Sequence, residues 1–477
     1  MPLTRVTTRA AIGTAAVLSV TAALAAGCGR AGGGTTSSPT SSSAASSTSS
    51  AAGTSAGDFG TLSDICHGNT GGGTKGGTDQ GVTASSIEVG VLSDYGYTKD
   101  PQLLNAATVF TDWCNAQGGI DGRKLVADIH DTELMEVVSA MSKACASDFV
   151  LAGSSAALDG LAVDARLKCL LPDFDAEPIM PQNQGSGLQI TPYTSNSVYS
   201  PYVGYYKWLL QKYPDSADHV GVLFGQSVIT DVDDSMVEQT VADDGGKVAY
   251  NGSFPISGVT NWTPYAEAVK AKGIKGLTFY DTPQTLAAFE QALDNIGYHL
   301  DWIDANTNAY GTDFIQIDGK ALTDQRNYAD LPGIYPVEKA AANPAMTRLV
   351  QLFHQYAPGQ PVTLMVEEAF SAWLIFAQSA GTCGADLTRS CVYNAAVKQT
   401  DWTAGGLTAP VDEATPLSAP ECFDIEQATA SGWEPAVGFT ANTDGVYSCG
   451  QEPADKLTGM PAATQLSTVG ESLSDLK

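Results

Sequence analysis

The chain has 477 residues, too many for one small domain, and 43% of them are hydrophobic, which is enough for two sizeable cores. It carries 52 acidic against 24 basic residues, a formal net charge of −28. Nucleic acid and anionic membrane surfaces are therefore poor partners for it. Acidity of this kind also favours solubility, so charge alone identifies no function.

The first 27 residues have the features of a secretory signal peptide. Two arginines precede a weakly apolar stretch, 10–26, which is short and diluted with polar residues for a membrane-spanning helix. It ends in Leu24-Ala25-Ala26-Gly27-Cys28, which resembles the lipobox of bacterial lipoproteins. A usual lipobox has leucine where Ala25 stands. The resemblance implies cleavage before Cys28, lipidation of Cys28 and anchoring to the outer face of the bacterial cell membrane.

The segment 28–60 is almost entirely Gly, Ser, Thr and Ala. Such a segment cannot bury enough apolar surface to offset its chain entropy. It predicts a flexible tether between the lipid and a folded body.

Eight cysteines remain after Cys28. An even number in an exported chain favours disulfides, and the absence of any CxxC pair argues against a zinc site. The pairs that we favour are Cys145–Cys169, Cys383–Cys391 and Cys422–Cys449, which leaves Cys66–Cys114 by default.

Short apolar runs alternate along the chain with segments of helical period. The first strand is expected at 87–92, followed by a turn at 93–97 and a helix at 103–115. Further strands are expected at 125–129, 148–152, 169–174, 220–224, 276–280 and 302–305, and further helices at 157–167, 233–243 and 285–295. Strands that alternate with helices predict parallel sheets with helices on both faces.

The string Asn115-Ala116-Gln117-Gly118-Gly119-Ile120-Asp121-Gly122-Arg123-Lys124 reads as a helix stop, a tight turn and the start of a strand. In this position after the first strand it resembles the signature of type I periplasmic binding proteins, and within them the Leu/Ile/Val-binding group. The resemblance covers roughly residues 82–450. It implies an α/β fold of two lobes, each a parallel sheet sandwiched by helices, with three hinge crossings near 189–192, 333–336 and 417–419.

The resemblance also implies a division of the chain. Lobe 1 would comprise 82–190 and 334–416, lobe 2 would comprise 191–333 and 417–450, and 451–477 would be a surface tail. In this arrangement Cys145 lies just before the strand 148–152 and Cys169 begins the neighbouring strand. Both then lie at the same edge of one sheet, close enough to bridge.

In open parallel sheets, ligands bind beyond the carboxyl ends of the strands. For lobe 1 this rule selects Tyr95, Tyr97, Ser154, Ser155, Phe174 and Asp175, and for lobe 2 it selects Gln226, Tyr280, Asp281, Asn306 and Thr307. Ser154 and Ser155 resemble a family loop that holds a ligand carboxylate, although a serine there also serves as a helix N-cap. Tyr280 resembles a family aromatic that packs on the ligand, with ordinary core packing as the alternative.

Amino-acid-binding members of the family place a carboxylate of lobe 2 against the ligand ammonium. The matching position in this chain is Asn306 or Thr307, and neither is charged. Asp281 or Asp304 would have to take that role, or else the ligand is a neutral polar solute. The near absence of Lys and Arg at the strand ends argues against phosphate and multiply anionic ligands.

The sequence gives no support for an enzyme. It has no H-E-x-x-H helix and no phosphate-binding G-x-x-x-x-G-K-[ST] loop, and its histidines are scattered. The acidic pairs Asp233-Asp234 and Asp243-Asp244 are interpreted as solvated helix faces or ends. No metal or cofactor is expected.

The predicted function is therefore that of a monomeric, lipid-anchored solute-binding receptor of an ABC uptake system. It would bind a small amino-acid-like or neutral polar organic solute in the cleft between the lobes by hinge closure, and a membrane permease would read the closed form. The alternative is a lipoprotein that presents its ligand to a membrane receptor or kinase.

Overall fold

The structure is a computed structural model that describes residues 56–67, 78–227 and 229–477. The predicted signal peptide, Cys28 and most of the predicted tether lie outside the described residues. The described residues belong to one compact unit. Within the described ranges no helix combines the length and the apolar composition needed to cross a bilayer.

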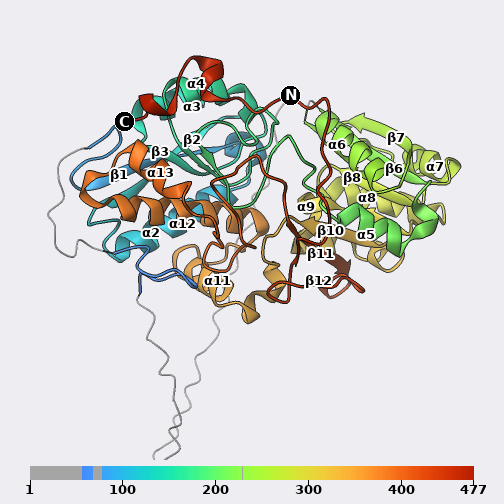
Figure 1. Ribbon diagram of the computed structural model, residues 1–477. Helices are drawn as coiled ribbons and strands as arrows, with labels where there is room; N and C mark the ends of the chain where they lie inside the picture. Colours follow the sequence, from blue (N-terminus) through green and yellow to red (C-terminus); the bar gives the residue numbers. More distant parts are fainter. Residues whose placement is uncertain (1–55, 68–77, 228) are drawn as a thin grey trace, which may run out of the picture. The chain divides into compact units, whose positions relative to one another are not determined.

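The first sheet has five parallel strands in the order β2-β1-β3-β4-β5 (Figure 1). They are β1 (Ser86–Ser93), β2 (Lys124–Asp131), β3 (Val150–Ser154), β4 (Asp173–Asp175) and β5 (Gln189–Ile190). Successive side chains of β1 point to opposite faces, so Val91 enters the core beneath α2 while Leu92 enters the core beneath α3.

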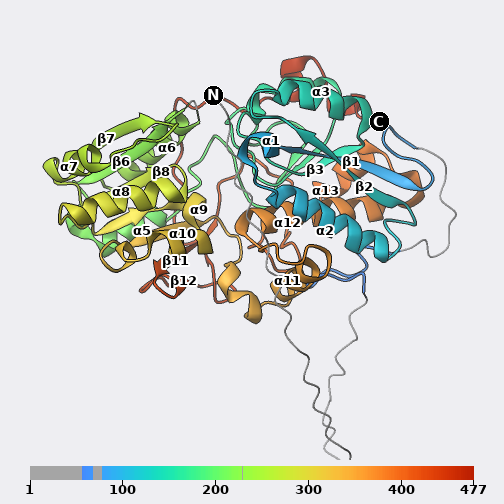
Figure 2. The ribbon, with the colours of Figure 1, turned by 180° about the vertical axis from the view of Figure 1, so that it is seen from behind.

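The helices of this lobe come from two separate stretches of the chain, 95–168 and 344–396. They are α1 (Tyr95–Thr98), α2 (Gln102–Ala116), α3 (Val137–Ser147), α4 (Val163–Lys168), α11 (Pro344–Tyr356), α12 (Leu364–Cys383) and α13 (Arg389–Ala396). Helices α2 and α12 pack side by side on one face of the sheet, and α3 and α4 cover the other (Figure 1, Figure 2). Short 3-10 helices add η1 (Asp159–Leu161), η4 (Val337–Ala342), η5 (Gly384–Asp386), η6 (Leu466–Val469) and η7 (Leu473–Asp475).

The second sheet is mixed. Its order is β12-β11-β10-β9-β8-β6-β7, and β13 pairs with β11. Its strands are β6 (Val220–Gln226), β7 (Val248–Pro255), β8 (Gly276–Tyr280), β9 (Trp302–Asp304), β10 (Asn327–Leu331), β11 (Cys422–Thr429), β12 (Gly432–Pro435) and β13 (Ser448–Cys449). The predicted strands β6, β8 and β9 are parallel, as are β7 and β10, which were not predicted, whereas β11 runs antiparallel to β10 and β12, so the sheet is not all-parallel as expected. Because only two residues connect β11 to β12, these strands can pair only as an antiparallel hairpin.

Helices cover both faces of this sheet. They are α5 (Tyr205–Lys212), α6 (Thr230–Asp243), α7 (Thr263–Ala271), α8 (Pro283–Asn295), α9 (Asn306–Ala309) and α10 (Thr312–Asp318), with η2 (Pro214–Ser216) and η3 (Ala321–Thr323). Helices α5 and α6 share one hydrophobic cluster with the sheet, and α7, α8 and α10 share another. The two-lobed α/β fold predicted from the sequence is therefore confirmed.

Both predicted ends of the folded body are wrong. The tether was expected to continue to Gly60, yet Phe59 has no exposed surface and lies 5.1 Å from Phe370, measured between ring centroids. The expected surface tail contains Leu457, Leu466 and Leu476, which are at most 9% exposed. Burial of these apolar side chains contributes favourable free energy that helps to order the segments that carry them.

All four predicted disulfide pairs are present. The reason given for Cys145–Cys169 is wrong, because Cys145 lies within α3 and Cys169 directly follows α4. The bridge therefore joins two helices rather than two strand ends. The strand expected from Cys169 begins only at Asp173, because Leu170 has a φ of +52° and Pro172 lacks an N–H.

Candidate functional site

A cavity of about 360 Å³ has lining residues from both lobes. Lobe 2 contributes the carboxyl ends of β8, β9 and β10 and the beginning of α6. Lobe 1 contributes the segment that follows β4 and the side chain of Glu368 on α12. The volume lies in the range of small-molecule sites.

Four of the residues predicted for lobe 2 line this cavity, namely Tyr280, Asp281, Asn306 and Thr307. Tyr280 is 5% exposed, and its hydroxyl hydrogen-bonds the hydroxyl of Tyr202, a residue that the sequence analysis missed. Asn306 has a φ of +47°, and its Nδ2 is buried with no hydrogen-bond partner among the described residues. Gln226 is exposed at the end of β6 and does not line the cavity, although the adjacent Ser227 does.

The residues predicted for lobe 1 lie elsewhere. Tyr95 and Tyr97 are 38% and 65% exposed on α1. Phe174 is fully buried and packs on Phe376 in the core, with 5.5 Å between ring centroids. Asp175 accepts hydrogen bonds from the side chains of Asn183 and Gln189, at 2.9 and 3.3 Å.

The two predicted serines are held within lobe 1. The Oγ of Ser154 accepts a hydrogen bond from the Leu92 N–H at 3.0 Å, and the Ser155 N–H donates to the Leu92 carbonyl at 3.2 Å. Ser154 and Ser155 line a separate cavity of about 20 Å³. That volume is of the order of one water molecule and is too small for an organic solute.

Six carboxyl groups line the main cavity: Glu177, Asp233, Asp281, Asp304, Asp330 and Glu368. None of the described lining residues is Lys, Arg or His. The site is therefore strongly acidic, and the charge state of these carboxyls determines which solutes it accepts.

Asp304, at the end of β9, is the best satisfied of these carboxyls. It is 1% exposed and accepts hydrogen bonds from the hydroxyls of Tyr205 and Tyr206, at 3.1 and 2.6 Å, and from the Asn306 N–H at 3.0 Å. Burial raises the pKa of Asp304 to about 6, and the hydrogen bonds from the tyrosines and from Asn306 oppose that rise.

Asp330, at the end of β10, is much less well satisfied. It is 6% exposed, and its Oδ1 has no hydrogen-bond partner among the described residues. Burial, with a smaller contribution from Asp304, raises the pKa of Asp330 well above its usual range. Glu368 on the lobe 1 side is 3% exposed, and burial, followed by repulsion from Glu177, raises its pKa well above the usual range.

Glu177 of lobe 1 and Asp233 of lobe 2 repel each other electrostatically. Burial, followed by repulsion from Asp159, raises the pKa of Glu177 to about 7. Burial, followed by repulsion from Glu177, raises the pKa of Asp233 to about 7. Asp159 fixes the segment after β4, because its carboxylate accepts the backbone N–H groups of Ile179 and Met180 at 2.8 and 2.9 Å.

Part of this acidic lining could have been found in the sequence. The pair Glu367-Glu368 interrupts an otherwise apolar helix. Because acidic side chains are rarely buried unless they have a structural or functional role, this pattern indicates functional carboxyls. Asp233 was interpreted as part of a solvated helix face, and that interpretation is wrong because Asp233 lines the cavity. Glu177 carries no such signal, because its position depends on the path of the segment after β4.

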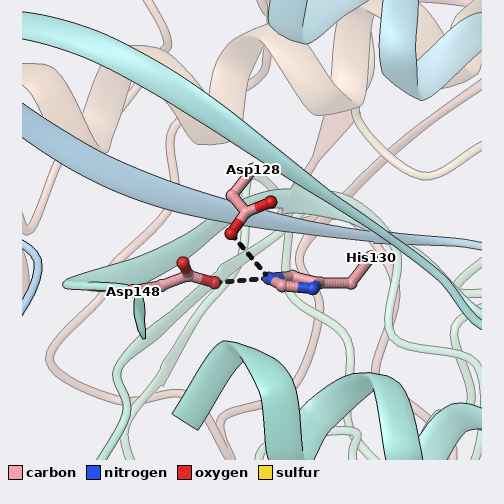
Figure 3. A group of neighbouring side chains, drawn as sticks. All are labelled: Asp128, His130 and Asp148. Carbon is pink, nitrogen blue, oxygen red and sulfur yellow. Dashed lines mark hydrogen bonds and ion pairs between the residues drawn. The ribbon is translucent and has the colours of Figure 1, made fainter. Parts of the chain in front are cut away.

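A second group of titratable residues lies on lobe 1, where Asp128, His130 and Asp148 converge (Figure 3). The His130 Nε2 lies 2.7 Å from Asp148 Oδ2 and 3.6 Å from Asp128 Oδ2. Both carboxylates lie near the same ring nitrogen, Nε2. A proton on Nε2 would donate a hydrogen bond to the fully buried Asp148, and this hydrogen bond explains why the three residues lie together. We assign it a structural role.

Comparison with known proteins identifies the family. The family model described as "Periplasmic binding protein" matches residues 86–416, more than half of the chain. The chain therefore belongs to the periplasmic binding protein family, a family of extracytoplasmic proteins that bind solutes. A comparison with curated protein sequences finds no match.

Solved structures have the same fold at low sequence identity. A fatty acid ABC transporter substrate-binding protein from Thermomonospora curvata is 17% identical, with a TM-score of 0.65 over 84% of this chain and 100% of that one. A substrate-binding periplasmic protein from Ralstonia solanacearum is 15% identical, with a TM-score of 0.62 over 74% and 100%. A leucine-binding protein from Thermotoga maritima is 14% identical, with a TM-score of 0.57 over 74% and 98%.

Proposed function

We propose that the protein is the lipid-anchored, extracytoplasmic solute receptor of an ABC uptake system. The observation that carries this proposal is the cavity of about 360 Å³ whose lining comes from both lobes. A small organic solute in that position touches both lobes at once, so its binding energy favours the conformation in which they approach. Similar structures described as ABC transporter components, from Thermomonospora curvata and Rhodospirillum rubrum, support the assignment.

Ligand contacts on lobe 2 are assigned to Tyr280, Asp281, Asn306 and Thr307, all of which line the cavity. On lobe 1, Glu177 and Glu368 replace the residues expected from the strand ends. A membrane permease recognises the closed form. The lipid is attached to Cys28, which holds the receptor at the outer face of the membrane as a monomer.

The proposal is tested by solute binding and by uptake. A thermal-shift screen of amino acids, amides, polyols, sugars and amines should give at least one solute that raises the melting temperature, because a ligand of the folded state stabilises it by mass action. Deletion of the gene should then abolish uptake of that solute. Normal uptake together with loss of a signalling response would instead favour presentation of the ligand to a receptor or kinase.

Lipid anchoring is tested separately. Cells grown with labelled palmitate should incorporate the label into the protein, and the Cys28→Ser variant should lose both the label and its association with the membrane. Equal labelling of the variant would contradict the assignment of Cys28.

A further inference from the structure

We infer that the cavity binds an organic cation with at least two amine groups, such as an alkyl diamine or polyamine. This inference rests on the proposed solute-binding function and goes beyond it, because it specifies the charge of the solute. It departs from the amino-acid-like or neutral solute expected from the sequence.

The charge of the cavity lining is unbalanced. Six carboxyl groups line about 360 Å³, and none of the described lining residues is basic. Carboxylates withdrawn from water and facing one another are stable only when they are protonated or when a counter-charge is supplied. A fatty acid or any other carboxylate would add a negative charge to this set, and an uncharged solute would supply no counter-charge, so that the carboxyls would have to stay protonated.

One buried acceptor in the cavity, the Oδ1 of Asp330, has no donor among the described residues. Asp304 has three hydrogen-bond donors at its carboxylate, whereas the Oδ1 of Asp330 has none among the described residues although the residue is 94% buried, being 6% exposed. A buried carboxylate oxygen without a donor is costly and rare. A primary ammonium supplies three N–H donors and the compensating charge in one group.

The carboxyls of the cavity are distributed over both lobes. Asp304 and Asp330 lie at strand ends of lobe 2, while Glu177 and Glu368 belong to lobe 1. One ammonium at Asp330 leaves the lobe 1 carboxyls unpaired, whereas a molecule with an amine at each end neutralises both sides. It would also give closure its driving force, because each lobe attracts the opposite end of the same solute.

The non-acidic part of the lining suits an alkyl spacer. Tyr193, Tyr202 and Tyr280 line the cavity together with Ile229 and Met236. Aromatic faces pack on methylene groups and attract cations. A cavity lined by carboxyls of both lobes and by aromatic and aliphatic side chains complements a dication with an apolar middle.

Isothermal titration calorimetry of the purified protein tests this inference. The probes are 1,4-diaminobutane and spermidine, with L-leucine, acetamide and octanoate as the amino-acid, neutral and anionic comparisons. We expect saturable binding of at least one of the two amines and no binding of the other three. Affinity should rise between pH 5 and pH 8, because the carboxyls must lose their protons to pair with the cation.

Variants locate the interaction. Asp330→Asn and Glu368→Gln should each weaken amine binding at least tenfold, whereas Asp112→Asn, at an exposed position of α2, should leave it unchanged. The melting temperature of each variant shows that it is folded, and the selectivity of the unmodified protein is informative without any variant.

The outcomes separate this inference from the proposed function. Binding of leucine, acetamide or octanoate without either amine would overturn the inference and leave a solute receptor of another specificity. Amine binding that is insensitive to both Asp330→Asn and Glu368→Gln would overturn it as well. If a folded protein binds none of the five compounds, the inference fails, and the wider thermal-shift screen then decides whether the receptor function fails with it.

Discussion

The buried carboxyl of Asp304 makes the stability of the unliganded protein depend on pH. Burial raises the pKa of Asp304 from 3.8 to about 6, so the folded chain holds this proton to a higher pH than the unfolded chain does. The stability contributed by the protonated carboxyl is therefore fully present below about pH 3.8 and is lost as the pH rises through 6. The Asp304→Asn variant has no proton to lose and should not show this loss.

The size of the effect follows from the shift in pKa. A rise of about two units, at roughly 1.4 kcal/mol per unit, makes ionised Asp304 cost roughly 3 kcal/mol of folding free energy. Asparagine keeps one oxygen, which can accept from the Tyr205 hydroxyl at the position of Oδ1, and its amide nitrogen can donate to the Tyr206 hydroxyl at the position of Oδ2. Relative to the unmodified protein, the variant should therefore gain roughly 3 kcal/mol of stability between pH 4 and pH 7.5.

Thermal unfolding of both proteins across this pH range measures the difference. The gap between their melting temperatures should widen by several degrees as the pH rises. Comparing the two proteins removes the contribution of the buried carboxyls that do not interact with Asp304, whereas Asp330, whose pKa Asp304 raises, titrates at a lower pH in the variant. Parallel profiles, with a constant gap from pH 4 to pH 7.5, would refute the reasoning.

Three further predictions concern other parts of the fold. Leu466→Ala should cost about 2–4 kcal/mol in chemical denaturation, because Leu466 packs on Val163 and Leu167, whereas Leu473→Ala, at a residue 56% exposed, should change stability by less than about 0.5 kcal/mol; equal effects would contradict a packed tail. His130→Ala should cost about 1–3 kcal/mol, because it removes the hydrogen bond at 2.7 Å to the fully buried carboxyl of Asp148 and leaves the Ser147 hydroxyl at 2.8 Å as a donor, while His354→Gln on the exposed side of α11 should be neutral; a neutral His130→Ala would disprove the structural role. Peptide mapping without reduction should recover all four bridges, and the double variant Cys145→Ser/Cys169→Ser should lose about 3 kcal/mol; any other pairing would contradict the packing of α3 on α4.

Much of the fold could be predicted because its elements are encoded locally. The buried strands β1, β6 and β8 are short segments rich in apolar residues, and α2 has a helical apolar period that ends before Gly118-Gly119. Strand β7 was not predicted, because six of its eight residues alternate between partly and fully exposed positions and carry little apolar signal. Strand β4 is shorter than predicted because Leu170 and Pro172 interrupt the run before it.

The candidate site could be predicted only on one side. The rule that ligands bind at strand ends found Tyr280, Asp281, Asn306 and Thr307, because in lobe 2 the cavity begins where the strands stop. In lobe 1 the lining comes from a segment that follows β4 by two residues and from Glu368, almost two hundred residues further along the chain. No local pattern brings these two parts together; they meet because α12 packs against β3 and β4.

The most direct test of the account is a crystal structure of the protein grown with 1,4-diaminobutane or spermidine. We expect the amine in the cavity between the lobes, with one nitrogen within hydrogen-bond distance of Asp330 and another beside Glu177 or Glu368. An amine bound elsewhere, with this cavity filled by solvent, would contradict both the assignment of the site and the inferred charge of its solute.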